Sequence, residues 1–133
     1  MTVSTYIQRS NQTVKYLVID VDISKRHFLQ MEEKEALNKY LPEAAKTAGQ
    51  ILKYLSQMGI QSYLESSGFR GFHIWIFFTE WIPSRYVVLL VDQLEEKIQL
   101  DNDDVTVEYF PNKSRVKNGS PGLAVKLPLG YHF

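Results

Sequence analysis

The chain has 133 residues, 44% of them hydrophobic and 13% aromatic, which is enough apolar material for one folded domain and excludes a disordered chain. It contains no cysteine, which excludes disulfides, thiolate metal sites and a cysteine nucleophile, and its polar N-terminus and short apolar runs predict a cytoplasmic protein without a signal peptide or membrane span. Fifteen basic and fifteen acidic residues cancel, so the chain lacks the positive excess with which proteins usually grip duplex nucleic acid through its phosphates.

The first half of the chain alternates β-forming and helical patterns. Its long helical stretch contains Pro42, and the residue before a proline avoids the helical conformation, so we expect two pieces rather than one helix. In the second piece, apolar residues at helical spacing predict a face buried against a sheet, formed by Ala45, Ala48, Ile51, Leu52, Leu55 and Met58. Expected in chain order are a strand at 15–23, a connection at 24–30, helical pieces at about 32–40 and 42–58, a C-cap at Gly59 and a strand at 60–65.

The second half completes an α+β pattern. A strand at 72–78 is followed by a helix from Ser84 to about Leu100, a strand at 105–110, a polar loop and a short strand at 123–127. The order β-α-β-β-α-β predicts one RRM-like, or ferredoxin-like, domain over residues 1–133, with an antiparallel sheet and helices packed on one face. In such a sheet the strand at 105–110 lies beside the first strand, and the other face is free for a site.

Two acids, Asp20 and Asp22, end the apolar run of the first strand. Successive side chains on a strand alternate between faces, so these two carboxylates point the same way. Carboxylates held this close repel each other unless a positive group lies between them. An exposed, solvated strand face is the simpler interpretation of so short a motif, but two acids on a strongly apolar strand favour a divalent cation.

The stretch from Ser67 to Trp75, SGFRGFHIW, has the composition of a phosphate site. Its glycines let backbone N–H groups approach an anion closely, while Ser67 can donate to a phosphate and Arg70 can pair with one. His73 enters the following strand, from which its imidazole can reach the same anion. Taken singly, each residue has a plainer interpretation, such as a Ser-Gly turn or a buried structural histidine. Together they predict an anion site.

Two further segments carry candidate residues. Glu108, on the strand at 105–110, would stand next to Asp20 and supply a third carboxylate; if it is instead an exposed strand residue, Asp104 is another candidate acid. Lys126 lies in an apolar strand and must reach water or an anion. His132 follows a Pro/Gly turn that suits it to fold back towards the same place.

These four motifs, in this order, resemble those of the archaeo-eukaryotic primase superfamily, the primase-polymerases. The family's hDhD strand corresponds to Ile19–Asp22, its SGxxGxHxW element to Ser67–Trp75, its single acid after a hydrophobic residue to Glu108, and its KxPxxxH run to Lys126–His132. The form KLPLGYH is most similar to primase-polymerase domains of prokaryotic conflict and CRISPR-associated systems. The chain departs from many relatives in having Glu at the third acid, in lacking zinc-binding cysteines and in ending one residue after His132.

The resemblance implies a metal-dependent nucleotidyltransferase, a DNA primase or polymerase that adds nucleotides from nucleoside triphosphates to a template-paired 3′-hydroxyl. It implies single-stranded or primer-template nucleic acid as a partner, no membrane, and a catalytic core that can belong to a larger multidomain protein. The implied ligands of two divalent cations, Mn²⁺ or Mg²⁺, are Asp20, Asp22 and Glu108. The implied triphosphate ligands are Ser67, Arg70, His73, Lys126 and His132. Weaker candidates for phosphate, template or base contact are Lys25, Arg26, Phe69, Lys113 and Arg115.

Two other classes of protein share this fold. A non-catalytic RRM-like module that binds nucleotides or nucleic acid shows exposed aromatics on its first and third strands, whereas the first strand here has acids that would repel phosphate. A replication-initiator nuclease needs a His-hydrophobic-His metal pair, and this chain has His73 followed by Ile74 and Trp75. The acids and the missing second histidine therefore favour the primase-polymerase interpretation.

Overall fold

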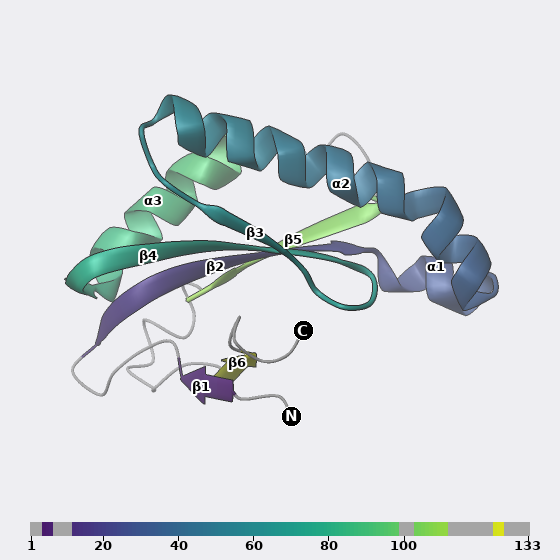
Figure 1. Ribbon diagram of the computed structural model, residues 1–133, viewed down its shortest axis with the longest axis horizontal. Coiled ribbons are helices and arrows are strands. Elements are labelled where there is room, and N and C mark those ends of the chain that lie inside the picture. The colour runs from purple at the N-terminus through teal and green to yellow at the C-terminus, as the bar shows by residue number, and fades with distance from the viewer. Residues whose placement is uncertain (1–3, 7–11, 99–102, 112–123, 127–133) are drawn as a thin grey trace.

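The computed structural model describes residues 4–6, 12–98, 103–111 and 124–126, with 4–6 and 124–126 described by their backbone alone. A four-stranded antiparallel sheet of order β3-β4-β2-β5 carries helices on one face (Figure 1). This order is the ferredoxin-like one, so the predicted fold class is confirmed. The elements are β1 (Ser4–Tyr6), β2 (Thr13–Ile23), α1 (Lys25–Gln30), α2 (Glu33–Gln57), β3 (Tyr63–Ser66), β4 (Gly71–Pro83), α3 (Ser84–Lys97), β5 (Val105–Phe110) and β6 (Ala124–Lys126). No helix in the described ranges is long and apolar enough to cross a membrane.

Strand β2 lies between β4 and β5, and its side chains project alternately to the two faces of the sheet. Its odd-numbered residues, from Leu17 to Ile23, are fully buried beneath α2 and α3, where each contributes about 1.5–3 kcal/mol of hydrophobic stabilisation. Its even-numbered residues from Tyr16 to Asp22, after a register shift that leaves Val14 in the core, point to the opposite face. Alternation along a single strand thus builds the core on one side and places the acids on the other.

Helix α2 is continuous through Pro42, so the prediction of two separate pieces was wrong. Proline removes the hydrogen bond to the carbonyl of Asn38, but Asn38 and Pro42 both lie on the exposed side, where water can bind that carbonyl. Ala36 and Ala44, on either side of the proline, are fully buried, so packing holds both halves on the core. The predicted buried face was wrong at two positions, since Ala45 and Met58 are exposed. The predicted end is confirmed, because Gly59 follows the helix with a φ of 76°.

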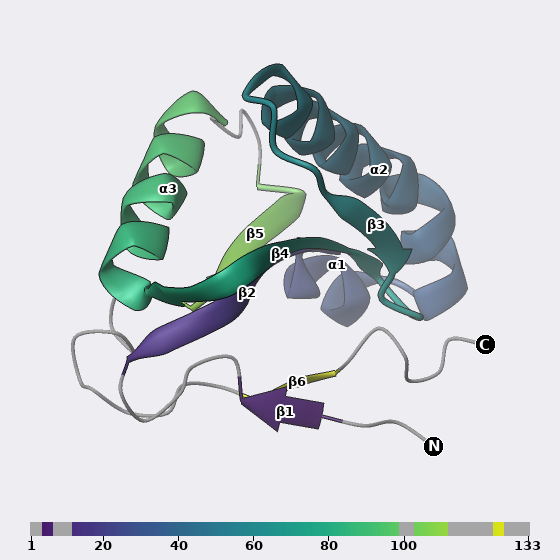
Figure 2. The same cartoon turned by 60° about the vertical axis from the view of Figure 1, so that its left-hand side comes forward.

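The segment before α2 and the last strand differ from the predicted pattern. Residues 25–30, expected as an irregular connection, form the short helix α1. The last predicted strand is present as β6, but it pairs antiparallel with β1 in a separate two-stranded sheet. Figures 1 and 2 show this small sheet on the side of the main sheet opposite the helices. The face that carries Asp20 and Asp22 is therefore the face turned towards β1 and β6.

Candidate active site

Four titratable side chains form one row across the whole main sheet. The strand register places Glu65 opposite His73, His73 opposite Asp20, and Asp20 opposite Glu108. Directly opposed residues in an antiparallel sheet project from the same face, so all four lie on the face away from the helices. The row contains the first acid of the hDhD motif, the histidine of the second motif and the acid of the third.

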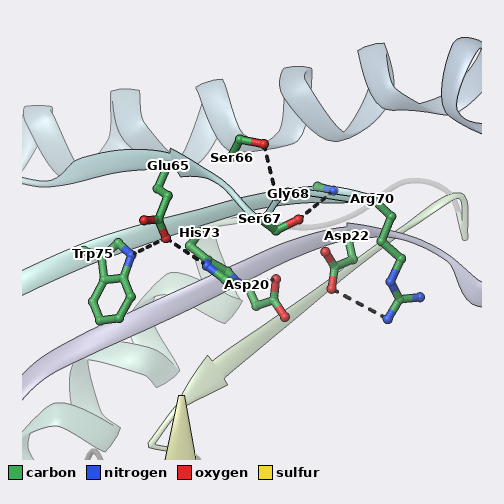
Figure 3. A network of polar contacts seen from close by, with 10 residues as sticks. Asp20, Asp22, Glu65, Ser66, Ser67, Gly68, Arg70, His73 and Trp75 are labelled. Carbon is green, nitrogen blue, oxygen red and sulfur yellow. Dashed lines mark hydrogen bonds and ion pairs between the residues drawn. The ribbon is translucent and has the colours of Figure 1, made fainter. Parts of the chain in front are cut away.

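Asp20 is the least compensated group in this row. Its Oδ1 atom is buried and has no hydrogen-bond partner in the described part of the chain, and it lies 3.5 Å from Nε2 of His73 (Figure 3). Burial, with the neighbouring charges of Asp22 and Glu108, raises the pKa of Asp20 to about 7, and the charge of Arg70 only partly opposes this rise. A carboxylate in this condition is suited to bind a cation.

Asp22 lies beside Arg70 and Gly71. Its Oδ2 atom is 3.8 Å from Nη2 of Arg70, whose Nη1 donates to the carbonyl of Ile23 at 3.5 Å. Gly71 is opposite Asp22 in the register, and a Cβ there would lie 1.9 Å from the carbonyl oxygen of Val21 and 2.7 Å from Oδ1 of Asp22. Only glycine therefore lets β4 approach the acid pair this closely.

The turn between β3 and β4 is held by its own serines. Ser67 Oγ accepts from the backbone N–H of Gly71 at 3.2 Å, Ser66 Oγ accepts from that of Gly68 at 3.2 Å, and Gly68 has a φ of 89°. A serine hydroxyl that accepts one hydrogen bond can still donate its own proton. Ser67 and Arg70 thus lie near Asp22 at one end of the sheet (Figure 3). Ser67 provides a hydroxyl donor and Arg70 a positive charge beside the acids.

Glu65 is the residue of this site that the sequence analysis missed. Its Oε1 atom lies 3.2 Å from Nδ1 of His73 and accepts a hydrogen bond from Nε1 of Trp75 at 3.1 Å. The signal available was the hairpin: a short SSGFRG turn between two antiparallel strands puts Glu65 across from His73 once the register is known. Without the register, an acid on a short exposed strand carried no distinguishing pattern.

The remaining predicted residues include several whose side chains the structure does not describe. Lys126 is on β6 and is described by its backbone only, while His132, Lys113 and Arg115 lie outside the described residues. Phe69 is half-exposed and packs against Phe28 with ring centroids 5.3 Å apart.

Asp104, the alternative candidate for the third acid, contacts residues of α1. It contacts Nε2 of His27 at 2.8 Å and Nη2 of Arg26 at 3.2 Å, so it faces α1. Arg26 is likewise engaged by Asp103 and Asp104, and Lys25 is exposed on α1. Neither Asp104 nor the basic residues of α1 belong to the row on the main sheet.

A divalent cation fits the acids on this face of the sheet in part. Asp20 and Asp22 supply hard oxygen donors, the ligands that Mg²⁺ and Mn²⁺ prefer, and the buried Oδ1 of Asp20 has no hydrogen-bond partner in the described ranges. Glu108 is opposite Asp20 but exposed. Among the described residues, no three His, Asp or Glu side chains are gathered closely enough to surround an ion. The two aspartates are thus the firm part of the fit, and Glu108, opposite Asp20 in the register, is the third candidate carboxylate.

Comparison with known proteins identifies a family for the chain and a solved structure of similar fold. The family described as "TOTE conflict system, Archaeo-Eukaryotic Primase domain" matches residues 1–133. No curated protein matches the chain. A similar solved structure is the polymerase domain of ligase D from Mycobacterium tuberculosis in complex with DNA, with a TM-score of 0.51 and 16% sequence identity. The match covers 87% of this chain but 39% of that one, and at this identity it shows a shared fold. Since the family match extends over the full sequence, the chain belongs to the archaeo-eukaryotic primase domains of TOTE conflict systems.

Proposed function

We propose that this domain is the catalytic core of a metal-dependent primase-polymerase that transfers nucleotides from nucleoside triphosphates to a template-paired 3′-hydroxyl. The observation that carries the proposal is the buried Oδ1 of Asp20, which faces His73 beside Asp22 and has no hydrogen-bond partner among the residues that the structure describes. Membership of a primase-domain family supports a nucleotidyltransferase type of function. The DNA bound to the ligase D polymerase domain supports nucleic acid as the partner.

Asp20, Asp22 and Glu108 would hold the cations on the acidic side of the site. When bound, Mn²⁺ or Mg²⁺ supplies activation of the attacking hydroxyl and stabilisation of the charge on the transferring phosphate. The carboxylates of Asp20 and Asp22 lie on one strand with fully buried neighbours, so their backbone is fixed in advance. Such preorganisation is what a site that stabilises developing charge requires.

Three residues beside the acids would bind the triphosphate: Ser67, Arg70 and His73. Arg70 lies 3.8 Å from Asp22, too far for a close hydrogen-bonded pair, so its guanidinium can turn to a phosphate at little cost once a cation balances Asp22. The Nε2 atom of His73 faces the acids and not the core. Lys126 and His132 would add positive charge from the C-terminal segment.

Primer extension with Mn²⁺ tests the proposal. Asp20→Asn or Asp22→Asn should reduce extension by about a thousandfold, because each removes a charged ligand from the metal. The matched control is Glu96→Gln, which removes an exposed carboxylate on α3 and should leave extension unchanged. His73→Ala should mainly raise the KM for the nucleotide, with the fold intact. Wild-type extension by either aspartate variant would overturn the metal assignment.

A non-catalytic nucleic-acid-binding module is the second candidate, and one observation favours it. Tyr16, Tyr63, Trp75 and Phe77 contact one another on the same face as Asp20, and Tyr63 and Phe77 are half-exposed. Rings in such positions stack on bases. Strand β2 therefore carries an aromatic residue, Tyr16, as well as its two acids. Binding of a single-stranded oligonucleotide by a wild-type domain that shows no extension with Mn²⁺ would support this candidate.

A further inference from the structure

Glu65 joins two aromatic side chains through a single oxygen atom. Its Oε1 lies 3.1 Å from the indole nitrogen of Trp75 and 3.2 Å from Nδ1 of His73, and its side chain is 15% exposed. An indole N–H can only donate, so Oε1 is an acceptor in this arrangement. The Nδ1 atom of His73, which shares that acceptor, must then carry the hydrogen of the neutral ring.

The support behind Glu65 is rigid. Trp75 is 1% exposed and is packed between Tyr16, at a centroid distance of 5.6 Å, and Phe77, at 5.8 Å with nearly parallel rings. The indole fixes the carboxylate, the carboxylate fixes Nδ1 of His73, and the opposite ring atom, Nε2, is left 3.5 Å from Oδ1 of Asp20 (Figure 3). This chain of contacts runs from the buried part of the sheet to the acids.

We propose that Glu65 is a positioning residue for nucleotidyl transfer. It holds the imidazole of His73 in one of its two ring orientations, with Nδ1–H directed to Glu65 and Nε2 turned towards the triphosphate, to which the imidazolium form of the ring donates from Nε2. Without this acceptor the ring can flip and turn a C–H edge towards the phosphate, and binding must then fix the ring again at a cost in entropy. The identity of the ligand in this inference rests on the proposed function, whereas the orientation of His73 does not.

Nuclear magnetic resonance of the histidine ring nitrogens tests the orientation without any activity. At mildly alkaline pH, we expect the hydrogen of His73 on Nδ1 in the wild type. Glu65→Gln should preserve this tautomer, because the amide oxygen still accepts from both rings, whereas Glu65→Leu should give a mixture or the Nε2–H form. A wild-type His73 that carries its hydrogen on Nε2, or a tautomer unchanged in Glu65→Leu, overturns the inference.

Calorimetric titration with a nucleoside triphosphate and Mn²⁺ tests the consequence. Glu65→Leu should weaken binding by about tenfold when His73 is present and by less than about twofold in a His73→Ala background, since a positioning residue acts through its partner. Glu65→Gln should restore most of the affinity, and Glu96→Leu on α3 is the exposed control. Equal losses in both backgrounds would show a general structural role and overturn the proposal. If the wild type binds no triphosphate, the proposed function fails, and the tautomer measurement still decides the orientation.

Discussion

Two aspartate–histidine pairs lie among the described residues, and their surroundings differ. In the pair of α1 and the turn before β5, Nε2 of His27 lies 2.8 Å from Oδ1 of Asp104, which also accepts from Arg26 at 3.2 Å. The buried His27 ring stacks on Tyr40 at 3.7 Å. In the pair on the main sheet, Nε2 of His73 is 3.5 Å from an Oδ1 of Asp20 that has no hydrogen-bond partner among the described residues.

We interpret the difference as that between a structural contact and the proposed ligand site. The carboxylate of the His27–Asp104 pair is held by His27 and Arg26, and the backbone around it is held by Ser24, whose N–H donates to the carbonyl of Asp104 at 2.8 Å and whose Oγ donates to that of Asp103. Nδ1 of His27 has no hydrogen-bond partner among the described residues. These contacts tie the end of β2 to the start of β5, which helps to set the register that places Glu108 opposite Asp20. The Oδ1 atom of Asp20 instead has no hydrogen-bond partner among the described residues, and this is why we propose an external cation as its partner.

Substitution of Asp20 should give the largest contrast. Asp20→Asn should reduce primer extension by about a thousandfold. It should also stabilise the cation-free domain by about 2 kcal/mol at pH 8, half of the full conversion of the pKa rise because the carboxylate is partly hydrated.

The sign of this stability change follows from the direction of the shift. The pKa of Asp20 is raised in the folded state from its ordinary value of 3.8 to about 7, so the native state holds its proton more tightly and loses stability as the pH rises from about 4 to 7. Urea denaturation of the wild type and Asp20→Asn at pH 4 and pH 8, without divalent cations, should show a gain only at pH 8. A loss of stability at pH 8 would show that Asp20 is structurally paired, as Asp104 is.

Removal of Asp104 should give the opposite result. Asp104→Ala leaves the buried His27 without its acceptor and should lower the free energy of unfolding by about 2 kcal/mol. Extension per folded molecule, measured well below the melting temperature, should stay within about threefold of the wild type. The matched control is Asp103→Ala, whose side chain is 89% exposed and whose loss should have little effect. An equal destabilisation by both variants would contradict the assignment of the contact to Asp104.

The sequence predicted the positions of the acids on the main sheet and missed the contact of His27 with Asp104. Asp20 and Asp22 could be placed on one face because strand alternation is local, and Glu108 beside them because the β-α-β-β-α-β order fixes which strands are neighbours. The contact of His27, on α1, with Asp104, in the turn before β5, joins residues 77 positions apart. No local sequence pattern indicates such a pair. Glu65 was missed for the related reason that a register decides its partner.

The continuity of α2 through Pro42 shows that tertiary packing can outweigh a local conformational preference. The conformational preference before a proline is real, but burial of Ala36 and Ala44 on either side outweighs one missing hydrogen bond on the exposed side. The same limit applies to the buried face of α2, where the exact stripe depends on how the helix lies on the sheet. Patterns of residues thus predict elements and faces, and tertiary packing decides their continuity and orientation.

The affinity for Mn²⁺ should depend on pH through Asp20. Because the proton and the cation compete for a carboxylate with a pKa of about 7, the apparent affinity should fall by up to about tenfold per pH unit below 7 and level off above it. Thermal unfolding with and without Mn²⁺ at pH 6 and pH 8 measures this as a larger stabilisation at pH 8. Asp104→Ala should keep the dependence, and Asp20→Asn should lose it. An equal Mn²⁺ effect at both pH values would assign the cation to other ligands.

Substitution of Arg26 should give the smallest effect and locate the energy of the structural pair. Its side chain is 49% exposed, so its ion pairs with Asp103 at 3.8 Å and Asp104 at 3.2 Å lie in water and are screened by salt. Arg26→Gln should therefore cost about 0.5 kcal/mol or less in urea denaturation, and high salt should remove even that difference. Arg70→Gln should behave differently, since loss of Arg70 removes the cation that holds down the pKa of Asp20 and should weaken triphosphate binding. If Arg26→Gln instead destabilises the domain as much as Asp104→Ala, the contact depends on the arginine and not on the buried histidine.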